Sequence, residues 1–146
     1  MEHISKSQRL TRREFLRGAA LAYAAGLGTF GLSDGFITPK GIALRCASVV
    51  TDLQIPPTHR PYPDQYANCL FHATGSCGRC IERCPGGAIT EKGHDKKRCL
   101  EILMTEQKPW MEGVHGDGYI GMYAGCGLCQ TKVPCEGGIP PLPKRK

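Results

Sequence analysis

The feature that most constrains this chain is its set of nine cysteines, because eight of them lie between residues 69 and 135 of 146. The chain also has 19 glycines and 11 prolines, and only 7% of its residues are aromatic. Such a composition predicts many turns and a modest apolar core, so disulfides or bound metal must add stability. Because nine is odd, disulfides alone would leave one thiol unpaired.

The spacing of these cysteines indicates iron. A C-x2-C-x3-C-P run at residues 77–85 reproduces the last three ligands of C-x2-C-x2-C-x3-C-P, the run that holds [4Fe-4S] clusters in bacterial ferredoxins. The first ligand of that run would be residue 74, which is Thr74, and threonine is not an expected ligand. Cys69 is the nearest substitute. Thiolates suit this role because cluster iron prefers soft sulfur ligands.

The second half of the chain repeats the plan of a distant cysteine, a C-x2-C pair and a closing cysteine. In two-cluster ferredoxins the closing cysteine of a run ligates the other cluster. We therefore predict two [4Fe-4S] clusters whose closing ligands are crossed. The first set is Cys69, Cys77, Cys80 and Cys135, and the second set is Cys84, Cys99, Cys126 and Cys129. This assignment leaves Cys46 over.

Three other uses of the cysteines explain less of the pattern. A four-cysteine zinc site built from the two C-x2-C pairs would leave five cysteines unexplained. Disulfides need an oxidising compartment, and C-x2-C pairs staple loops poorly. A redox-active thiol pair of the thioredoxin type needs a strand-to-helix setting, which glycine-rich loops do not offer. A structural zinc module therefore remains as an alternative to electron transfer.

Residues 1–33 form an N-terminal segment with a basic start. The twin arginine Arg12-Arg13 is followed by an apolar run of 15 residues, 18–32. This run is shorter than the roughly 20 residues that a transmembrane helix needs, and the combination is typical of a twin-arginine export signal. The alternative is a first helix with Thr11 as its N-cap. Export would place the chain in the periplasm or at the membrane through its N-terminus, and without export the chain would be cytoplasmic.

Residues 34–63 are expected to combine turns with extended chain. Turns are predicted at 34–35 and 39–41, where glycine follows aspartate or a Pro-Lys pair. The apolar stretch 42–50 predicts a strand. The proline-rich stretch 56–63 cannot be a helix or a central strand, so it predicts an extended strap.

Residues 64–138 are expected to form the cluster domain. Asp64 is positioned to cap a short helix over 65–72, and Asp95 to cap a second helix. The apolar face of this second helix is expected to consist of Leu100, Leu103 and Met104.

The rest of the chain predicts little regular structure. Residues 109–125 hold five glycines without periodicity and are expected to form a long loop. Residues 139–146 are expected to form a flexible basic tail. The fold class is therefore expected to be α+β, a small, loop-rich, ferredoxin-like two-cluster domain with short helices around the clusters.

The formal charge of +6 does not indicate nucleic-acid binding. A [4Fe-4S] core with four thiolates carries a charge of about −2, so two clusters would lower the total to about +2. The interleaved basic and aromatic residues that single-strand binding needs are also lacking. We therefore expect a redox protein as the partner.

The cysteine motifs resemble the iron-sulfur region of epoxyqueuosine reductase and the related corrinoid-dependent reductive dehalogenases. The matching stretches are Cys77-Gly-Arg-Cys80 through Cys84-Pro-Gly-Gly-Ala-Ile89, Lys97-Arg-Cys99 and Gly125-Cys-Gly-Leu-Cys129, with Ala25-Gly-Leu-Gly-Thr-Phe-Gly31, Ile37-Thr-Pro39 and Ser48-Val-Val-Thr-Asp52 upstream. The resemblance covers roughly residues 22–138. Thr74 departs from the family pattern, and so does the spacing Cys129-x5-Cys135 with Pro134 before the last cysteine.

In the family that the chain resembles, two clusters feed electrons to a cobalamin that is bound mainly by a domain N-terminal to this region. Only some 20 residues precede the resemblance here, so we expect this corrinoid domain to be lacking. The resemblance therefore implies an iron-sulfur electron-transfer protein. The alternative is the electron-delivery module of a corrinoid-dependent reductase with catalysis in another chain. We expect an oxidoreductase component and not a complete enzyme.

Overall fold

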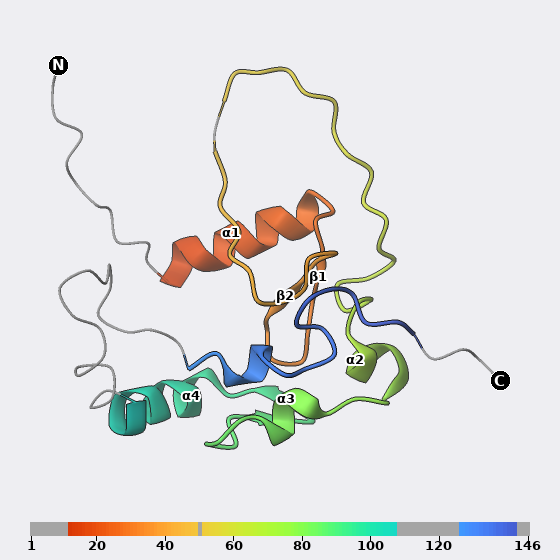
Figure 1. Ribbon diagram of the computed structural model, residues 1–146. Coiled ribbons are helices and arrows are strands. Elements are labelled where there is room, and N and C mark those ends of the chain that lie inside the picture. Colours follow the sequence, from red (N-terminus) through yellow and green to blue (C-terminus); the bar gives the residue numbers. More distant parts are fainter. Residues whose placement is uncertain (1–11, 50, 108–125, 143–146) are drawn as a thin grey trace, which may run out of the picture.

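The computed structural model describes residues 12–49, 51–107 and 126–142, and within them the elements are short (Figure 1). The α-helices are α1 (Arg12–Ala24), α2 (Leu70–Thr74), α3 (Arg79–Glu82) and α4 (Lys96–Ile102). The strands are β1 (Thr29–Phe30), β2 (Phe36–Ile37), β3 (Ile89–Thr90) and β4 (Gly93–His94). A π-helical turn η1 (Leu103–Gln107) and a 3-10 turn η2 (Leu128–Gln130) complete the set. The predicted α+β, loop-rich fold class is confirmed.

The strands form two small antiparallel hairpins. In the first, Thr29 pairs with Ile37 and Phe30 pairs with Phe36. Its turn follows the predicted Asp34-Gly35 signal, because Asp34 adopts a left-handed φ of 57°. In the second, Ile89 pairs with His94 and Thr90 pairs with Gly93. The first hairpin lies between α1 and the elements that carry the cysteines (Figure 1).

The N-terminal segment is helical from Arg12, as the helix alternative expects. The end of α1 packs on the first hairpin through Tyr23, whose ring centroid lies 6.0 Å from that of Phe30. Among the described residues, no helix is long and apolar enough to cross a membrane. None of these observations supports a twin-arginine signal, which stays a prediction.

Two predicted elements are wrong. No strand forms over 42–49, because this backbone has no partner strand and residues 43–49 run largely exposed. The helix predicted over 65–72 begins only at Leu70. Asp64 instead accepts a hydrogen bond from the Tyr66 N–H in a turn, and the Asn68 N–H is engaged by Thr29, so residues 65–68 do not continue as a helix.

Other predictions agree with the structure. The Asp95 carboxylate caps α4 by accepting hydrogen bonds from the N–H groups of Lys97 and Arg98, both at 3.0 Å. Residues 56–63 lack regular secondary structure, and all but Tyr62 are exposed; they belong to a segment that arches over α1 (Figure 1). The loop predicted over 109–125 and the end of the tail, 143–146, lie outside the described residues.

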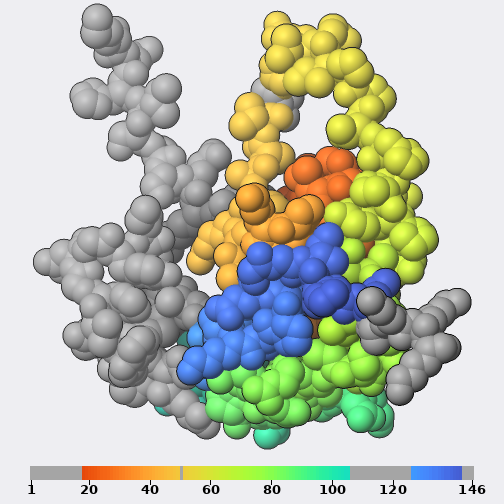
Figure 2. Space-filling view, turned by 45° about the vertical axis from the view of Figure 1, so that its right-hand side comes forward, coloured from red at the N-terminus to blue at the C-terminus, as the bar shows by residue number. Residues whose placement is uncertain are grey.

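The apolar core is small and is built partly from cysteine. Its buried members are Leu32, Ile37, Ile42, Cys69, Ile89 and Val133. Four half-buried cysteines pack against this cluster: Cys80, Cys84, Cys129 and Cys135. The C-terminal segment 126–142 joins the first hairpin to the α3 region, and Figure 2 shows it seated between the two. The core therefore lies where the cysteine-bearing loops meet.

Asn68 ties the loop that leads into Cys69 to the first hairpin. Its backbone N–H donates to the Thr29 hydroxyl at 2.9 Å, and its side-chain Nδ2 donates to the Ile37 carbonyl at 3.1 Å. Asn68 is buried, as are Thr29 and Ile37. These bonds hold Cys69 against the core across a separation of more than 30 residues.

We expect Asn68→Ala to lower the free energy of unfolding by about 1–3 kcal/mol, because it leaves a buried carbonyl without this donor. Urea unfolding under anaerobic conditions measures the change. Gln65→Ala is the matched control, since Gln65 is exposed and only its backbone carbonyl is used, by the Phe30 N–H. Equal stability of the two variants would contradict a structural role for the Asn68 amide.

Candidate metal centre

The cysteines lie on short elements that gather beside the first hairpin (Figure 1). Cys69 immediately precedes α2, Cys80 lies in α3, Cys99 in α4 and Cys129 in η2. All nine cysteines are free thiols. Disulfides therefore do not account for the cysteine content, and the positions of the thiols relative to one another decide what they can bind.

The first group of thiols surrounds Cys80. Burial raises the pKa of Cys80, and the neighbouring Cys69 and Cys77 raise it further. Burial also raises the pKa of Cys135 to about 11, with smaller contributions from Cys69, Cys80 and Cys77. Thiols perturb one another in this way only at short range. These four cysteines also line one small apolar cavity together with Cys129, Leu32, Phe71, Val133 and Pro134.

The second group surrounds Cys99. Burial raises the pKa of Cys99, and Cys126 and Cys84 raise it further. Burial is the main cause that raises the pKa of Cys129 to about 11. Cys126, Cys99 and, more weakly, Cys80 also raise it. The pKa shifts thus place Cys80 and Cys135 near Cys69 and Cys77, and Cys99 and Cys129 near Cys126, with Cys80 and Cys129 also close to each other. The assignment of eight cysteines to two clusters stays a prediction.

The closing cysteines have different neighbours. Cys80 lies within helix α3 and Cys84 follows it; Cys69 and Cys77 raise the pKa of Cys80, whereas Cys84 raises that of Cys99. At the other end of the chain, the Ile42 N–H donates to the Cys135 carbonyl at 2.8 Å. Gly41 allows this contact, since it has a φ of 93° and a Cβ there would lie 1.9 Å from the Glu136 carbonyl oxygen. The loop of Cys135 is thereby held against the first hairpin, on the side of Cys69.

Arg83 joins the two cysteine loops directly. Its Nε donates to the Leu128 carbonyl at 3.1 Å, and one terminal nitrogen donates to the Thr131 hydroxyl at 3.3 Å. Arg83 lies between Cys80 and Cys84 in sequence, and its acceptors flank Cys129. A half-buried arginine with two acceptors 45 and 48 residues away fixes the spacing between the loops.

The thiols also receive hydrogen bonds from the backbone. The Ala88 N–H donates to Cys84 Sγ at 3.2 Å. Hydrogen bonds from backbone N–H groups lower the pKa of Cys80, Cys129 and Cys135, but burial raises it by more. Donors of this kind stabilise a negative sulfur, and they tune the potential of a cluster bound through it.

Thr74, which stands where a cysteine would complete the ferredoxin run, faces away from the thiols. Its hydroxyl donates to the Leu70 carbonyl at 2.8 Å and lies 2.6 Å from the Ser76 hydroxyl. Thr74 is exposed, whereas Cys69 is buried at the start of the same helix. The geometry therefore offers Cys69, and not Thr74, to the first group.

A single ion and a four-iron cluster make different demands on these groups. In residues 12–49, 51–107 and 126–142, no three His, Cys, Asp or Glu side chains lie close enough to hold one metal ion. The thiolates of a [4Fe-4S] cube bind four different iron atoms and surround a larger body. Thiols that lie near one another beside an apolar wall supply the donor chemistry that two clusters need.

The contact of His94 depends on residues far away in the sequence. Its side chain is only 14% exposed and lies close to Asp34, with 3.5 Å between Nδ1 and Oδ2. Asp34 also pairs with Lys96 at 3.1 Å. The partners are about 60 residues apart, so no short-range pattern signals their contact.

Comparison with known proteins agrees with this geometry. Residues 73–136 match the 4Fe-4S double cluster binding domain. The chain is 32% identical to the epoxyqueuosine reductase of Bacillus anthracis over 126 residues, and this alignment covers 85% of this chain and 30% of the relative. It is 32% identical to the epoxyqueuosine reductase of Synechococcus sp. strain RCC307 over 121 residues, an alignment that covers 82% of this chain and 34% of that relative. No solved structure matches the chain.

The chain thus spans about a third of the length of the curated relatives that it matches. The matched domain includes seven of the eight grouped cysteines, all but Cys69. The chain therefore contains a 4Fe-4S double cluster binding domain that carries two [4Fe-4S] clusters, in a region shared with the epoxyqueuosine reductases.

Proposed function

We propose that this chain transfers electrons through two [4Fe-4S] clusters, which form a short electron-transfer path between a donor protein and an acceptor protein. The observation that carries the proposal is the match of residues 73–136 to a 4Fe-4S double cluster binding domain, and the effects of neighbouring thiols on one another's pKa support it. Each bound cluster cycles by one electron. Adjoining groups favour passage of an electron from one cluster to the next.

The chain's own residues have three roles in this proposal. The eight cysteines hold the clusters, with Cys69, Cys77, Cys80 and Cys135 around the first and Cys84, Cys99, Cys126 and Cys129 around the second. Arg83 keeps the two loops at a fixed spacing. The Ala88 N–H and the other backbone donors stabilise charge on sulfur, while the apolar wall around the first group excludes water.

A second candidate is the electron-delivery module of a corrinoid-dependent reductase whose catalytic residues lie in another chain. The similarity to epoxyqueuosine reductases over most of this chain, but only about a third of theirs, favours it. Both candidates use the same clusters and differ in the acceptor.

Metal content and spectra test the function. We expect anaerobically purified protein to contain about eight iron and eight sulfide per chain and to show a broad band at about 400 nm that bleaches with dithionite. Stoichiometric zinc in a colourless protein would contradict the cluster proposal and support the zinc alternative. Dialysis against hydroxocobalamin then separates the two candidates, since retained corrin favours the reductase module.

Paired cysteine substitutions test the crossed ligand sets. If Cys135 belongs with Cys77, the double variant Cys77→Ser/Cys135→Ser loses one cluster and keeps about four iron per chain. The double variant Cys77→Ser/Cys84→Ser spans both groups and should lose nearly all iron. An uncrossed arrangement predicts the opposite pair of results. Cys46→Ser is the control, because Cys46 lies in neither group, and it should keep about eight iron.

Thiol ionisation in the cluster-free protein gives a pH test. Burial raises the pKa of Cys129 and Cys135 to about 11, whereas an unperturbed cysteine ionises at about 8.5. Protonated thiols at these positions therefore stabilise the cluster-free fold below about pH 8.5, and this stabilisation is lost as the pH rises through 11.

Only the thiolate reacts with iodoacetamide, so alkylation of Cys129 and Cys135 in native buffer should keep accelerating up to about pH 11. In concentrated urea the same cysteines should reach half of their maximal rate at the unperturbed pKa of about 8.5. Peptide mass spectrometry at a series of pH values measures both rates. Identical profiles in the two solvents would show that the cluster-free chain does not bury these thiols.

A further inference from the structure

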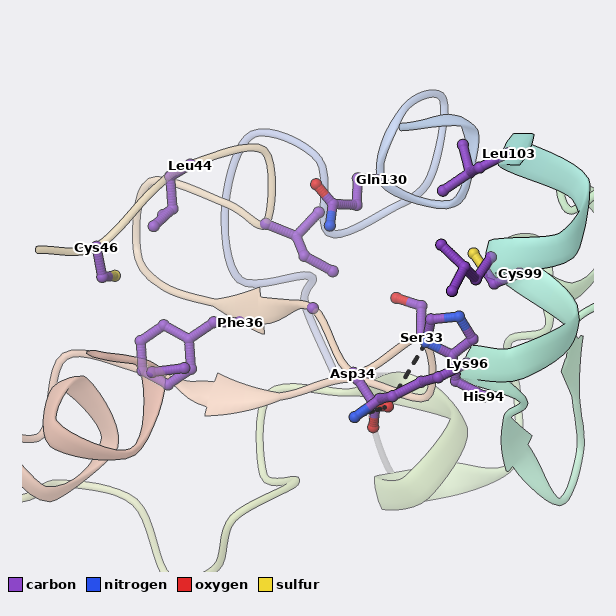
Figure 3. Close-up of a pocket in the computed structure, with 14 residues that line it drawn as sticks. Ser33, Asp34, Phe36, Leu44, Cys46, His94, Lys96, Cys99, Leu103 and Gln130 are labelled. Atoms are coloured by element: carbon purple, nitrogen blue, oxygen red, sulfur yellow. Dashed lines mark ion pairs between the residues drawn. The ribbon is translucent and has the colours of Figure 1, made fainter. Parts of the chain in front are cut away.

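A second cavity, beside the second thiol group, lies between the first hairpin, the segment that follows it and α4 (Figure 3). Its volume is about 390 Å³, which is within the usual range for small-molecule sites. Most of its lining is apolar, with contributions from Phe36, Ile42, Leu44, Leu100 and Leu103. A cavity of this kind binds a largely apolar molecule and orients it with a few polar groups.

Polar groups reach the cavity from more than one element. Ser33 and His94 lie together, and the amide of Gln130 comes from the C-terminal segment (Figure 3). His94 Nδ1 lies 3.5 Å from Asp34 Oδ2, and neither of its buried ring nitrogens has a hydrogen-bond partner in the part of the chain that the structure describes. Because an unpaired buried polar group is costly, a ligand atom that bonds to His94 would stabilise this arrangement.

The charges at the cavity favour a neutral ligand. Asp34 and Lys96 both line it, and their charges offset each other across 3.1 Å. No other Lys, Arg, Asp or Glu is among the described residues of the lining. A phosphate-bearing cofactor such as a nucleotide would lack the extra positive charge that phosphates attract. The lining instead suits an uncharged ring with hydrogen-bond acceptors at opposite ends.

Cys99 connects this cavity to the second thiol group. Cys99 lines the cavity. The Cys99 thiol is also close enough to Cys126 and Cys84 for both of them to raise its pKa. A cluster held by that group would thus lie next to the cavity. A ligand here is placed to exchange electrons.

We propose that this cavity binds the headgroup of a quinone and passes it electrons from the clusters. The inference rests on the proposed electron-transfer function. One quinone takes two electrons, one from each reduced cluster, and two protons from solvent to give the quinol. No bond to the protein forms. A His94 N–H would donate to one carbonyl oxygen and the Gln130 amide to the other.

Binding of duroquinone to the cluster-loaded protein tests the proposal. Its ring is fully substituted and so does not add to thiols such as that of Cys46. Equilibrium dialysis against oxidised protein measures binding, and recovery of the absorbance band after mixing dithionite-reduced protein with duroquinone measures electron transfer. We expect saturable binding and recovery at a rate that saturates with duroquinone concentration.

Two variants and their controls place the site. Ala19→Trp fills the cavity from α1, whereas Ala20→Trp adds the same side chain at the next residue, which is exposed and does not line it. We expect Ala19→Trp to abolish saturable binding and Ala20→Trp to keep it. His94→Phe should weaken binding roughly tenfold through loss of one buried hydrogen bond. His94→Gln, which keeps a donor, should recover part of that loss.

The result also separates this inference from the function on which it rests. The quinone site is overturned if protein with about eight iron per chain does not bind duroquinone. It is also overturned if Ala19→Trp and His94→Phe bind duroquinone as well as the unsubstituted protein does. Either result leaves the cluster proposal intact. Protein without iron that still binds duroquinone in a His94-dependent way overturns electron transfer and supports the binding site alone. Iron content of each variant, measured beside the dialysis, shows that the fold is retained.

Discussion

The structure depends on the packing of thiols against a small apolar core. Among the described residues, six buried side chains form one apolar cluster, one of them Cys69, and four more cysteines pack against it. In a chain this size such a cluster contributes limited free energy. Ligand binding by the same cysteines therefore adds directly to folding, because clusters cross-link segments that few apolar contacts hold together.

The predicted crossing of the closing cysteines would let both clusters share one core. Cys84 raises the pKa of Cys99, while the Cys135 carbonyl accepts a hydrogen bond from the Ile42 N–H and its thiol lies near Cys69. In that arrangement each cluster would draw ligands from both halves of the chain. Arg83 adds a direct link between the same two loops. The distance between the groups is thus fixed by covalent connections and hydrogen bonds together, as electron passage between them requires.

Sequence patterns predicted the parts of this arrangement that depend on short-range chemistry. The cysteine spacing predicted a two-cluster domain, which the match of residues 73–136 confirms, and the Asp95 side chain predicted the start of α4. The patterns failed where long-range contacts decide the structure. Residues 42–49 have strand-like composition but no partner strand, and Asn68 leaves a helical pattern to bond Thr29, 39 residues away. The burial of His94 also depends on distant segments of the chain, so no local pattern indicates it.

Helix α4 lies between the second thiol group and the cavity, so it links these two sites. Its cap at Asp95 fixes where the first turn starts, and the helix then carries Cys99 in the second thiol group and Leu100 on the wall of the cavity. His94 immediately precedes the cap, so the same backbone turn orients its ring. A shift of α4 along its axis would move the thiol and the cavity wall together. The cap of one short helix therefore couples the geometry of the cluster to that of the neighbouring cavity.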